Sequence, residues 1–72
     1  MEKMSEAEVA LMVASWNAHH KAGTAVRVLL DDGSFRKTMT RSEAWMLGPM
    51  PVVQVDGIGG GYSLLRVAVD WE

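Results

Sequence analysis

The hydrophobic pattern at the start of the chain has the period of an α-helix. Its apolar stripe recurs at helical spacing and consists of Val9, Met12, Val13, Trp16 and His20. Ser5 and Glu8 have the spacing of a capping box, in which a hydroxyl and a carboxylate each satisfy a backbone N–H at the start of a helix. The sequence therefore predicts a helix over about residues 5–19.

Beyond Gly23 the pattern changes from helical spacing to alternation. Val26, Val28 and Leu30 fall on one face of a predicted strand, and Asp32-Gly33 has the composition of a tight turn. The segment that follows is more polar, which is typical of an edge strand. We expect a first hairpin over about residues 25–40.

The second half of the chain again shows apolar runs that are separated by capping and turn residues. Cap-forming residues at 40–43 precede an apolar run at 44–47, which Gly48-Pro49 ends, so the pattern predicts a short helix over about residues 42–47. Two further strand-like runs flank the glycine-rich segment 56–61 and predict a second hairpin over about residues 51–69.

These elements predict one α+β domain over residues 1–72. Its N-terminal helix would pack on a small, strongly bent antiparallel sheet or an SH3-like partial barrel of four to five strands. The strands carry apolar residues on both faces, with Leu29, Val52 and Leu64 opposite the expected interior. Either the helix or a second copy of the chain would have to cover them, so self-association as a dimer is one expectation.

Composition narrows the class of protein. The chain has 72 residues, 49% of them hydrophobic, no cysteine and a formal net charge of −2. Such a chain favours a cytoplasmic protein and disfavours tight, non-specific binding to duplex nucleic acid. The longest largely apolar stretch, residues 9–18, is too short to span a bilayer, and the first residues do not have the pattern of a signal peptide, so no membrane association is expected.

The residue types that carry chemistry do not form a recognisable constellation. The glycines at 57–61 precede a strand pattern, whereas a dinucleotide fingerprint precedes a helix. His19 and His20 are adjacent, so on a helix they point in different directions and do not converge on a metal. We therefore predict no catalytic, cofactor-binding or metal-binding residue, and no cofactor.

Basic residues are the first candidates for binding a partner. Arg36, Lys37 and Arg41 cluster on and after the second predicted strand. Together with Tyr62 on a curved sheet face, they suit single-stranded nucleic acid or an acidic partner. The alternative interpretation is an edge strand that uses charge to prevent aggregation.

Three tryptophans in so short a chain are informative. Trp16 and Trp45 are expected to be core anchors. Trp71 follows the last predicted strand and either closes the barrel or serves as an exposed interface anchor. The sequence thus predicts five partner-binding residues: Arg36, Lys37, Arg41, Tyr62 and Trp71.

Several runs of the sequence resemble a group of small proteins encoded by bacteriophages and prophages. The likeness lies between residues 16 and 67, in the runs 16–17, 23–28, 38–48, 51–57 and 60–64. Its most specific parts are Thr40-Arg41-Ser42-Glu43-Ala44-Trp45 and Pro51-Val52-Val53. The resemblance implies a phage or mobile-element origin and, because small phage proteins often bind host proteins, a host factor as partner.

The chain is also similar, more loosely, to the plasmid-borne type II dihydrofolate reductases, which are short SH3-like chains whose four copies build one active-site pore. Residues 23–27 and 53–55 carry this likeness. The Val-Gln-Ile-Tyr motif that supplies the pore in that family is interrupted here, because Asp56 replaces the tyrosine.

We therefore expect a non-catalytic interaction module that binds a protein partner. The alternatives are a nucleic-acid-binding module that uses the basic strand and, ranked below it, an oligomeric enzyme with a site shared between subunits. Salt dependence of binding would distinguish the first alternative and a solution mass the second.

Overall fold

The computed structural model describes residues 5–69 of the chain. One helix is followed by six strands and one turn of 3-10 helix. In chain order these elements are α1 (Glu6–His19), β1 (Ala25–Leu29), β2 (Phe35–Met39), β3 (Trp45–Leu47), β4 (Met50–Val55), β5 (Ile58–Ser63), η1 (Leu64–Arg66) and β6 (Val67–Val69).

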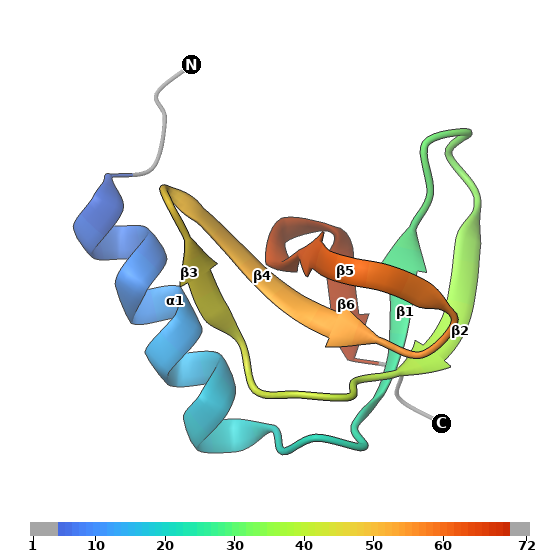
Figure 1. Cartoon of the computed structure of the whole chain (residues 1–72), viewed down its shortest axis with the longest axis horizontal. Coiled ribbons are helices and arrows are strands. Elements are labelled where there is room, and N and C mark those ends of the chain that lie inside the picture. The colour runs from blue at the N-terminus through green and yellow to red at the C-terminus, as the bar shows by residue number, and fades with distance from the viewer. Residues whose placement is uncertain (1–4, 70–72) are drawn as a thin grey trace.

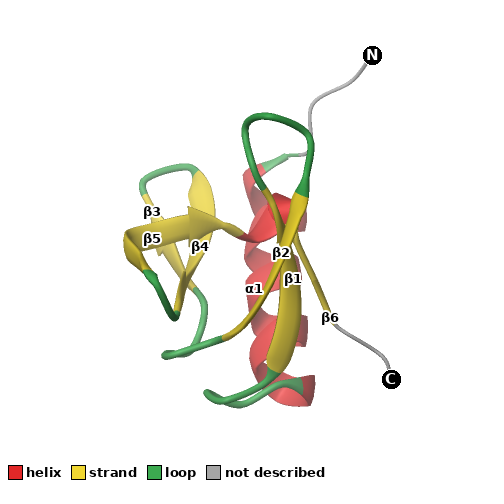
Figure 2. Ribbon diagram, turned by 90° about the vertical axis from the view of Figure 1, so that its right-hand side faces the viewer, coloured by secondary structure: helices red, strands yellow, loops and turns green. Residues whose placement is uncertain are grey.

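The strands form two small antiparallel sheets. The first has the order β2-β1-β6 and the second the order β3-β4-β5. Figure 1 shows α1 alongside the second sheet, and Figure 2 shows the two sheets as separate groups. A bridge between Thr40 and Val55 joins the sheets where β2 ends, but the barrel is not closed. The predicted α+β architecture is confirmed, with six strands in place of four to five.

Helix α1 begins where the capping box predicts. The Ser5 hydroxyl accepts a hydrogen bond from the Glu8 N–H at 3.2 Å, and the Glu8 carboxylate accepts one from the Ser5 N–H at 2.8 Å. The helix ends at His20, whose N–H donates to the Trp16 carbonyl. Val9 is buried, and the partly buried members of the same stripe, Met12, Val13 and Trp16, pack against the core.

The first hairpin also forms as predicted. Strands β1 and β2 pair from Ala25↔Met39 to Leu29↔Phe35. In the turn, the Asp32 carboxylate accepts hydrogen bonds from the Ser34 hydroxyl and the Ser34 N–H. These bonds stabilise the charged carboxylate, so they hold the pKa of Asp32 below its usual value.

The prediction of a short helix over residues 42–47 is wrong. Trp45–Leu47 is strand β3, which pairs with β4 through Trp45↔Val52 and Leu47↔Met50. The side chain of Asn17 fixes the preceding residue, since it donates to the Ala44 carbonyl at 2.9 Å and accepts from the Ala44 N–H at 2.8 Å. A helix this short forms few internal hydrogen bonds, whereas the strand gains a full ladder with β4.

The prediction of a single hairpin over residues 51–69 is also wrong in its second half. Strand β5 ends at Ser63, η1 redirects the chain, and β6 pairs with β1 through Val26↔Val69 and Val28↔Val67. The buried side chain of Leu64 lies at this change of direction. The apolar residues of 62–69 therefore belong to strands of two different sheets, and their alternation does not show where one strand ends and the other begins.

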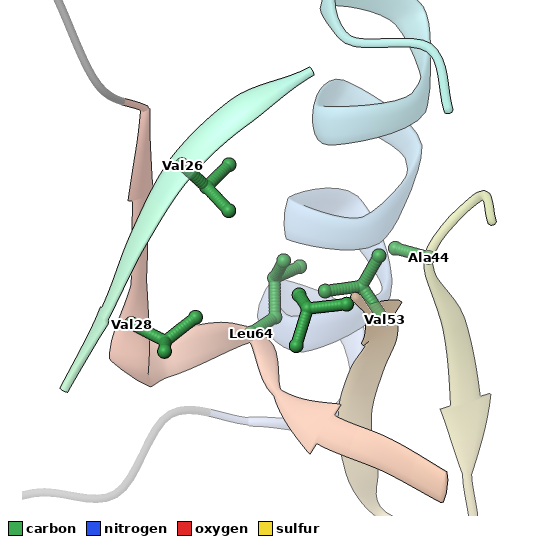
Figure 3. Packing of buried hydrophobic residues seen from close by; sticks show 6 residues of the cluster. Val26, Val28, Ala44, Val53 and Leu64 are labelled. Carbon is green, nitrogen blue, oxygen red and sulfur yellow. The ribbon is translucent and has the colours of Figure 1, made fainter. Parts of the chain in front are cut away.

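The core lies between the two sheets and the helix. Val26 and Val28 of β1 point toward Val53 of β4 and Leu64 of η1, with Ala44 at the entry to β3 (Figure 3). All five are buried, and Val26, Val28 and Val53 are inaccessible to solvent. Because these residues come from four segments distant in sequence, their packing holds the second sheet in a fixed position relative to the first.

Thr40 is the buried polar residue that joins the two sheets. Its side chain is 2% exposed, and its hydroxyl donates to the Lys21 carbonyl at 3.2 Å and accepts from the Thr24 N–H at 3.1 Å. Its backbone carbonyl accepts from the Gly23 N–H, and its backbone N–H donates to the Thr24 carbonyl. One residue thus ties the connection between α1 and β1 to the end of β2.

Replacing Thr40 with valine, which keeps the shape but removes the hydroxyl, is expected to lower the free energy of unfolding by about 0.5–1.5 kcal/mol. Both hydrogen bonds of the hydroxyl are lost, while the Thr24 N–H and the Lys21 carbonyl keep their bond to each other. Thr40→Ser keeps the hydroxyl and is expected to lose less. Urea denaturation of both variants measures the difference. Equal denaturation midpoints for the two variants would contradict this role of the hydroxyl.

Candidate functional site

The second sheet has two faces of different character. The inner face carries Pro51, Val53 and Val55 toward the core, where helix α1 covers it. The outer face carries the intervening residues of β3 and β4, because successive side chains of a strand point to opposite faces. Its three large exposed side chains are Trp45, Leu47 and Met50, which we call the outer patch.

The outer patch is a product of strand register. Pairing of β3 with β4 places Leu47 opposite Met50 and Trp45 opposite Val52, all on the outer face. Leu47 is 59% exposed and Met50 is 48% exposed, whereas the inner-face residue Val53 is fully buried. The sheet therefore presents a contiguous apolar surface on the side that neither the helix nor the first sheet covers.

Trp45 lies across the sheet and does not enter the core. The position of a Cβ built on Gly61 lies 3.3 Å from Trp45 Cζ2 and 2.9 Å from Val52 Cγ2, so the ring extends over β4 as far as β5. Val52 is only 3% exposed beneath it, while Trp45 itself remains 36% exposed. The prediction that Trp45 is a core anchor is therefore wrong: its ring covers Val52 on the outer face and presents its other side to solvent.

A shallow hollow lies at the other end of β4. It has a volume of about 460 Å³ and is lined by Arg41, Gln54, Val55 and residues 57–60. Gln54 is on the outer face by alternation, two residues from Val52. The hollow therefore lies at the end of β4 and meets the outer face at Gln54.

The three basic residues predicted from the sequence gather around the Asp56–Gly57 turn beside this hollow. Arg41 lies 3.2 Å from the Asp56 carboxylate, and both side chains are more than half exposed. The Arg36 guanidinium lies against Gly57, where a side chain would place its Cβ only 2.8 Å from Arg36 Nη2. Lys37 lines a second hollow with Arg36 on the other side of the turn. At this turn, the Asp56 carboxylate balances one of the two charges of Arg36 and Arg41.

Alternation separates two of these cations. Arg36 pairs with the buried Val28, and Lys37 pairs with the exposed Arg27, so their side chains leave β2 on opposite faces. The Arg27 guanidinium lies 5.7 Å from the centre of the Phe35 ring on the same outer face of the first sheet. The predicted basic cluster therefore follows the free edge of β2 and does not form a single flat face.

Tyr62 is not part of this cluster. Its ring is half-buried and packs against the core, and its hydroxyl donates a hydrogen bond to the Leu29 carbonyl. The hydroxyl thus links the second sheet to the first hairpin. The remaining predicted residue, Trp71, lies outside the residues that the structure describes.

Sequence reasoning missed the residues that form the outer patch. The signal was present in the alternation of Trp45 and Leu47, whose spacing of two is that of a strand face. The cap-like residues before them and Gly48-Pro49 after them favoured a helix instead. The sequence pattern places Gly61 in the segment that connects two predicted strands, whereas Gly61 lies in β5 and its lack of a side chain provides the space that the Trp45 ring occupies.

Within residues 5–69, no three His, Asp or Glu side chains are grouped so that they could hold a metal ion. His19 Nδ1 lies 2.8 Å from the Ser15 carbonyl, in the last turn of its own helix. In the same range, α1 falls short of the length and apolar character that a membrane-spanning helix needs.

Comparison with protein-family models, curated proteins and solved structures finds no match to this chain.

Proposed function

We propose that this protein is a non-catalytic interaction module that binds a partner protein through the outer face of its second sheet. The observation that carries the proposal is the exposure of Trp45, Leu47 and Met50 side by side on a sheet whose other face packs against the core and α1. Contiguous apolar surface of this kind is typical of sites that bind another protein.

The composition of the surface supports a protein partner. The Trp45 ring reaches Gly61 across Val52, and 36% of the residue remains exposed. Tryptophan side chains of this kind commonly dominate binding energy at protein interfaces. A positively charged rim, formed by Arg36 and Arg41 beside the hollow, adds a preference for an acidic residue in the partner.

The resemblance to phage-encoded proteins, carried by residues 40–45 and 51–53, suggests that the partner is a host protein. Four of those residues, Trp45, Pro51, Val52 and Val53, also lie in the second sheet and belong to its two faces. Under this proposal, Trp45 of the outer patch lies within the part of the sequence with the most specific likeness, and Leu47 and Met50 lie between its two runs.

A displayed library of random 16-residue peptides, selected against the full chain, tests the proposal. We expect the recovered peptides to combine large apolar and acidic residues and to bind Leu47→Ser at least tenfold more weakly. Leu65→Ser is the matched control, because Leu65 on η1 is the same residue type with the same exposed fraction of 59%. Its affinity for the same peptides is expected to stay unchanged.

Three results would contradict the proposal. The first is a selection that recovers no peptide above background, and the second is peptides that bind wild type and Leu47→Ser equally. The third is salt-sensitive binding of an oligothymidylate that is lost in Arg36→Gln but retained in Leu47→Ser, because that pattern indicates nucleic acid as the ligand.

A further inference from the structure

We propose that the partner binds as an extended segment that adds a strand to the free edge of β5. This inference rests on the proposed function and names the form of its ligand. Strand addition draws its affinity from main-chain hydrogen bonds and its specificity from the alternate side chains of the added strand. Three independent features of the second sheet support it.

The first feature is the chemistry of the sheet edges. Of the edge strands within residues 5–69, β3 and β6 have only three residues each, and β2 carries Arg36 and Lys37. Short length and charge are the usual means by which an edge avoids pairing with another chain. Strand β5 is IGGGYS, with neither charge nor proline. A bulge at Gly59 and Gly60 protects that part of its edge and leaves residues 61–63 in regular register with β4.

The second feature is a set of backbone groups without a strand partner. The register of β4 with β5 jumps from Val55↔Ile58 to Gln54↔Gly61, so Gly59 and Gly60 bulge out of the ladder. Within the part of the chain that the structure describes, β5 is bonded to β4 alone among the strands. All three residues at 59–61 are exposed glycines, so the strand itself presents no side chain to an incoming backbone there.

The third feature is the Trp45 ring, which reaches Gly61 at this edge. A strand added beside β5 would place every second side chain on the outer face, next to the indole. A large apolar side chain at that position extends the outer patch. An acidic residue on the same face, toward the bulge, would lie at the hollow that Arg41 and Gln54 line.

These features favour a foreign segment over a second copy of the chain. If two copies paired through β5, each would offer the other the outer-face residues of that strand, which are Gly61 and Ser63. Neither has an apolar side chain to cover Trp45. The complementary strand therefore has a large apolar residue where β5 itself has glycine or serine.

The test uses the peptides recovered in the selection above. Each peptide is resynthesised with single N-methyl groups at successive backbone nitrogens, and its affinity for the full chain is measured. We expect losses of tenfold or more at alternate positions and small effects between them, because only every second N–H of an added strand faces β5. Apolar and acidic residues should recur at even spacing.

A pair of protein variants provides the matching test. Gly59 has open space around a built Cβ, so both Gly59→Ala and Gly59→Lys are expected to fold. Gly59→Ala should retain peptide binding, whereas Gly59→Lys should weaken it at least tenfold, because a lysine at an edge opposes pairing. Circular dichroism of each variant controls for folding.

The outcomes separate this inference from the proposed function. Strand addition is overturned if the affinity of the peptides falls in Leu47→Ser but does not alternate along the N-methylated series and does not change in Gly59→Lys. The proposed interaction module would still stand in that case. A selection without any binding peptide overturns both. A dimer of the chain that dissociates in Gly59→Lys, seen by sedimentation at the assay concentration, would make a second copy the occupant of this edge and overturn the foreign segment.

Discussion

Replacing Val53 with alanine is expected to lower the free energy of unfolding by about 2–3 kcal/mol. Val53 is inaccessible to solvent and packs among residues of β1, η1 and the entry to β3. The change removes two buried methyl groups, each worth roughly 0.8 kcal/mol by transfer, and leaves a cavity that adds to the cost. A chain of this length has a total stability on the order of 4–11 kcal/mol, so the loss is a large share of it.

Urea denaturation followed by circular dichroism measures the Val53→Ala effect, and Gln54→Ala is the matched control. Gln54 is the next residue of the same strand, but it is exposed on the outer face, so its truncation should change stability by less than about 0.5 kcal/mol. If both variants unfold at the same urea concentration, then the packing of β4 against the first sheet and the helix contributes little to stability.

Replacing Gly61 with alanine is expected to displace the Trp45 ring and to destabilise the second sheet by about 1–3 kcal/mol. The added Cβ would lie 2.9 Å from Val52 Cγ2, closer than carbon atoms approach each other, and 3.3 Å from the indole. Neither neighbour moves easily, because Val52 is buried in β4 and Trp45 is held by the β3 ladder. The ring is the more exposed of the two, so we expect it to lift away from Val52.

The indole N–H resonance of Trp45 in a ¹H–¹⁵N spectrum reports this displacement directly. Gly59→Ala is the matched control, since a Cβ at Gly59 meets nothing within 4 Å, and it should leave that resonance unchanged. Gly61→Ala should also weaken the selected peptides, because it alters both the Trp45 surface and the edge beside it. An unshifted indole resonance in Gly61→Ala would show that Gly61 does not position the ring.

Val53 and Gly61 act on opposite faces of the second sheet. Val53 fixes the sheet from within, and Gly61 with Val52 supports Trp45 from outside. Gly61→Ala is therefore expected to reduce binding by more than its effect on stability explains, whereas Val53→Ala should reduce stability and leave the affinity of the folded fraction nearly unchanged.

The amino-acid sequence by itself determined the parts of the fold that depend on neighbouring residues. The capping box of Ser5 and Glu8, the helical stripe behind it and the turn around Asp32 all act over three or four residues, and each formed where the pattern predicts. The same local signals established a single α+β domain, because a helical period followed by alternating periods leaves few other arrangements.

Only the tertiary structure decided how residues 42–47 and 64–69 are used. Capping residues and an apolar run favour a helix in an isolated segment, but pairing with β4 and the two hydrogen bonds from Asn17 to Ala44 favour a strand. Residues 67–69 alternate like a continuation of β5, yet they pair with β1 in the other sheet. The bonds from Asn17 to Ala44 span 27 residues, and β6 pairs with β1, from which β2 to β5 separate it in the sequence. Contacts of this range leave no local periodic signal.

The candidate site divides in the same way. The cluster of Arg36, Lys37 and Arg41 is visible in the sequence because its members are close together along the chain, and the structure places them around one turn. The outer patch is not visible there, since its exposure depends on which face of the second sheet the helix covers. Burial of one face by α1 leaves the other to solvent, and that choice was made by packing and not by composition.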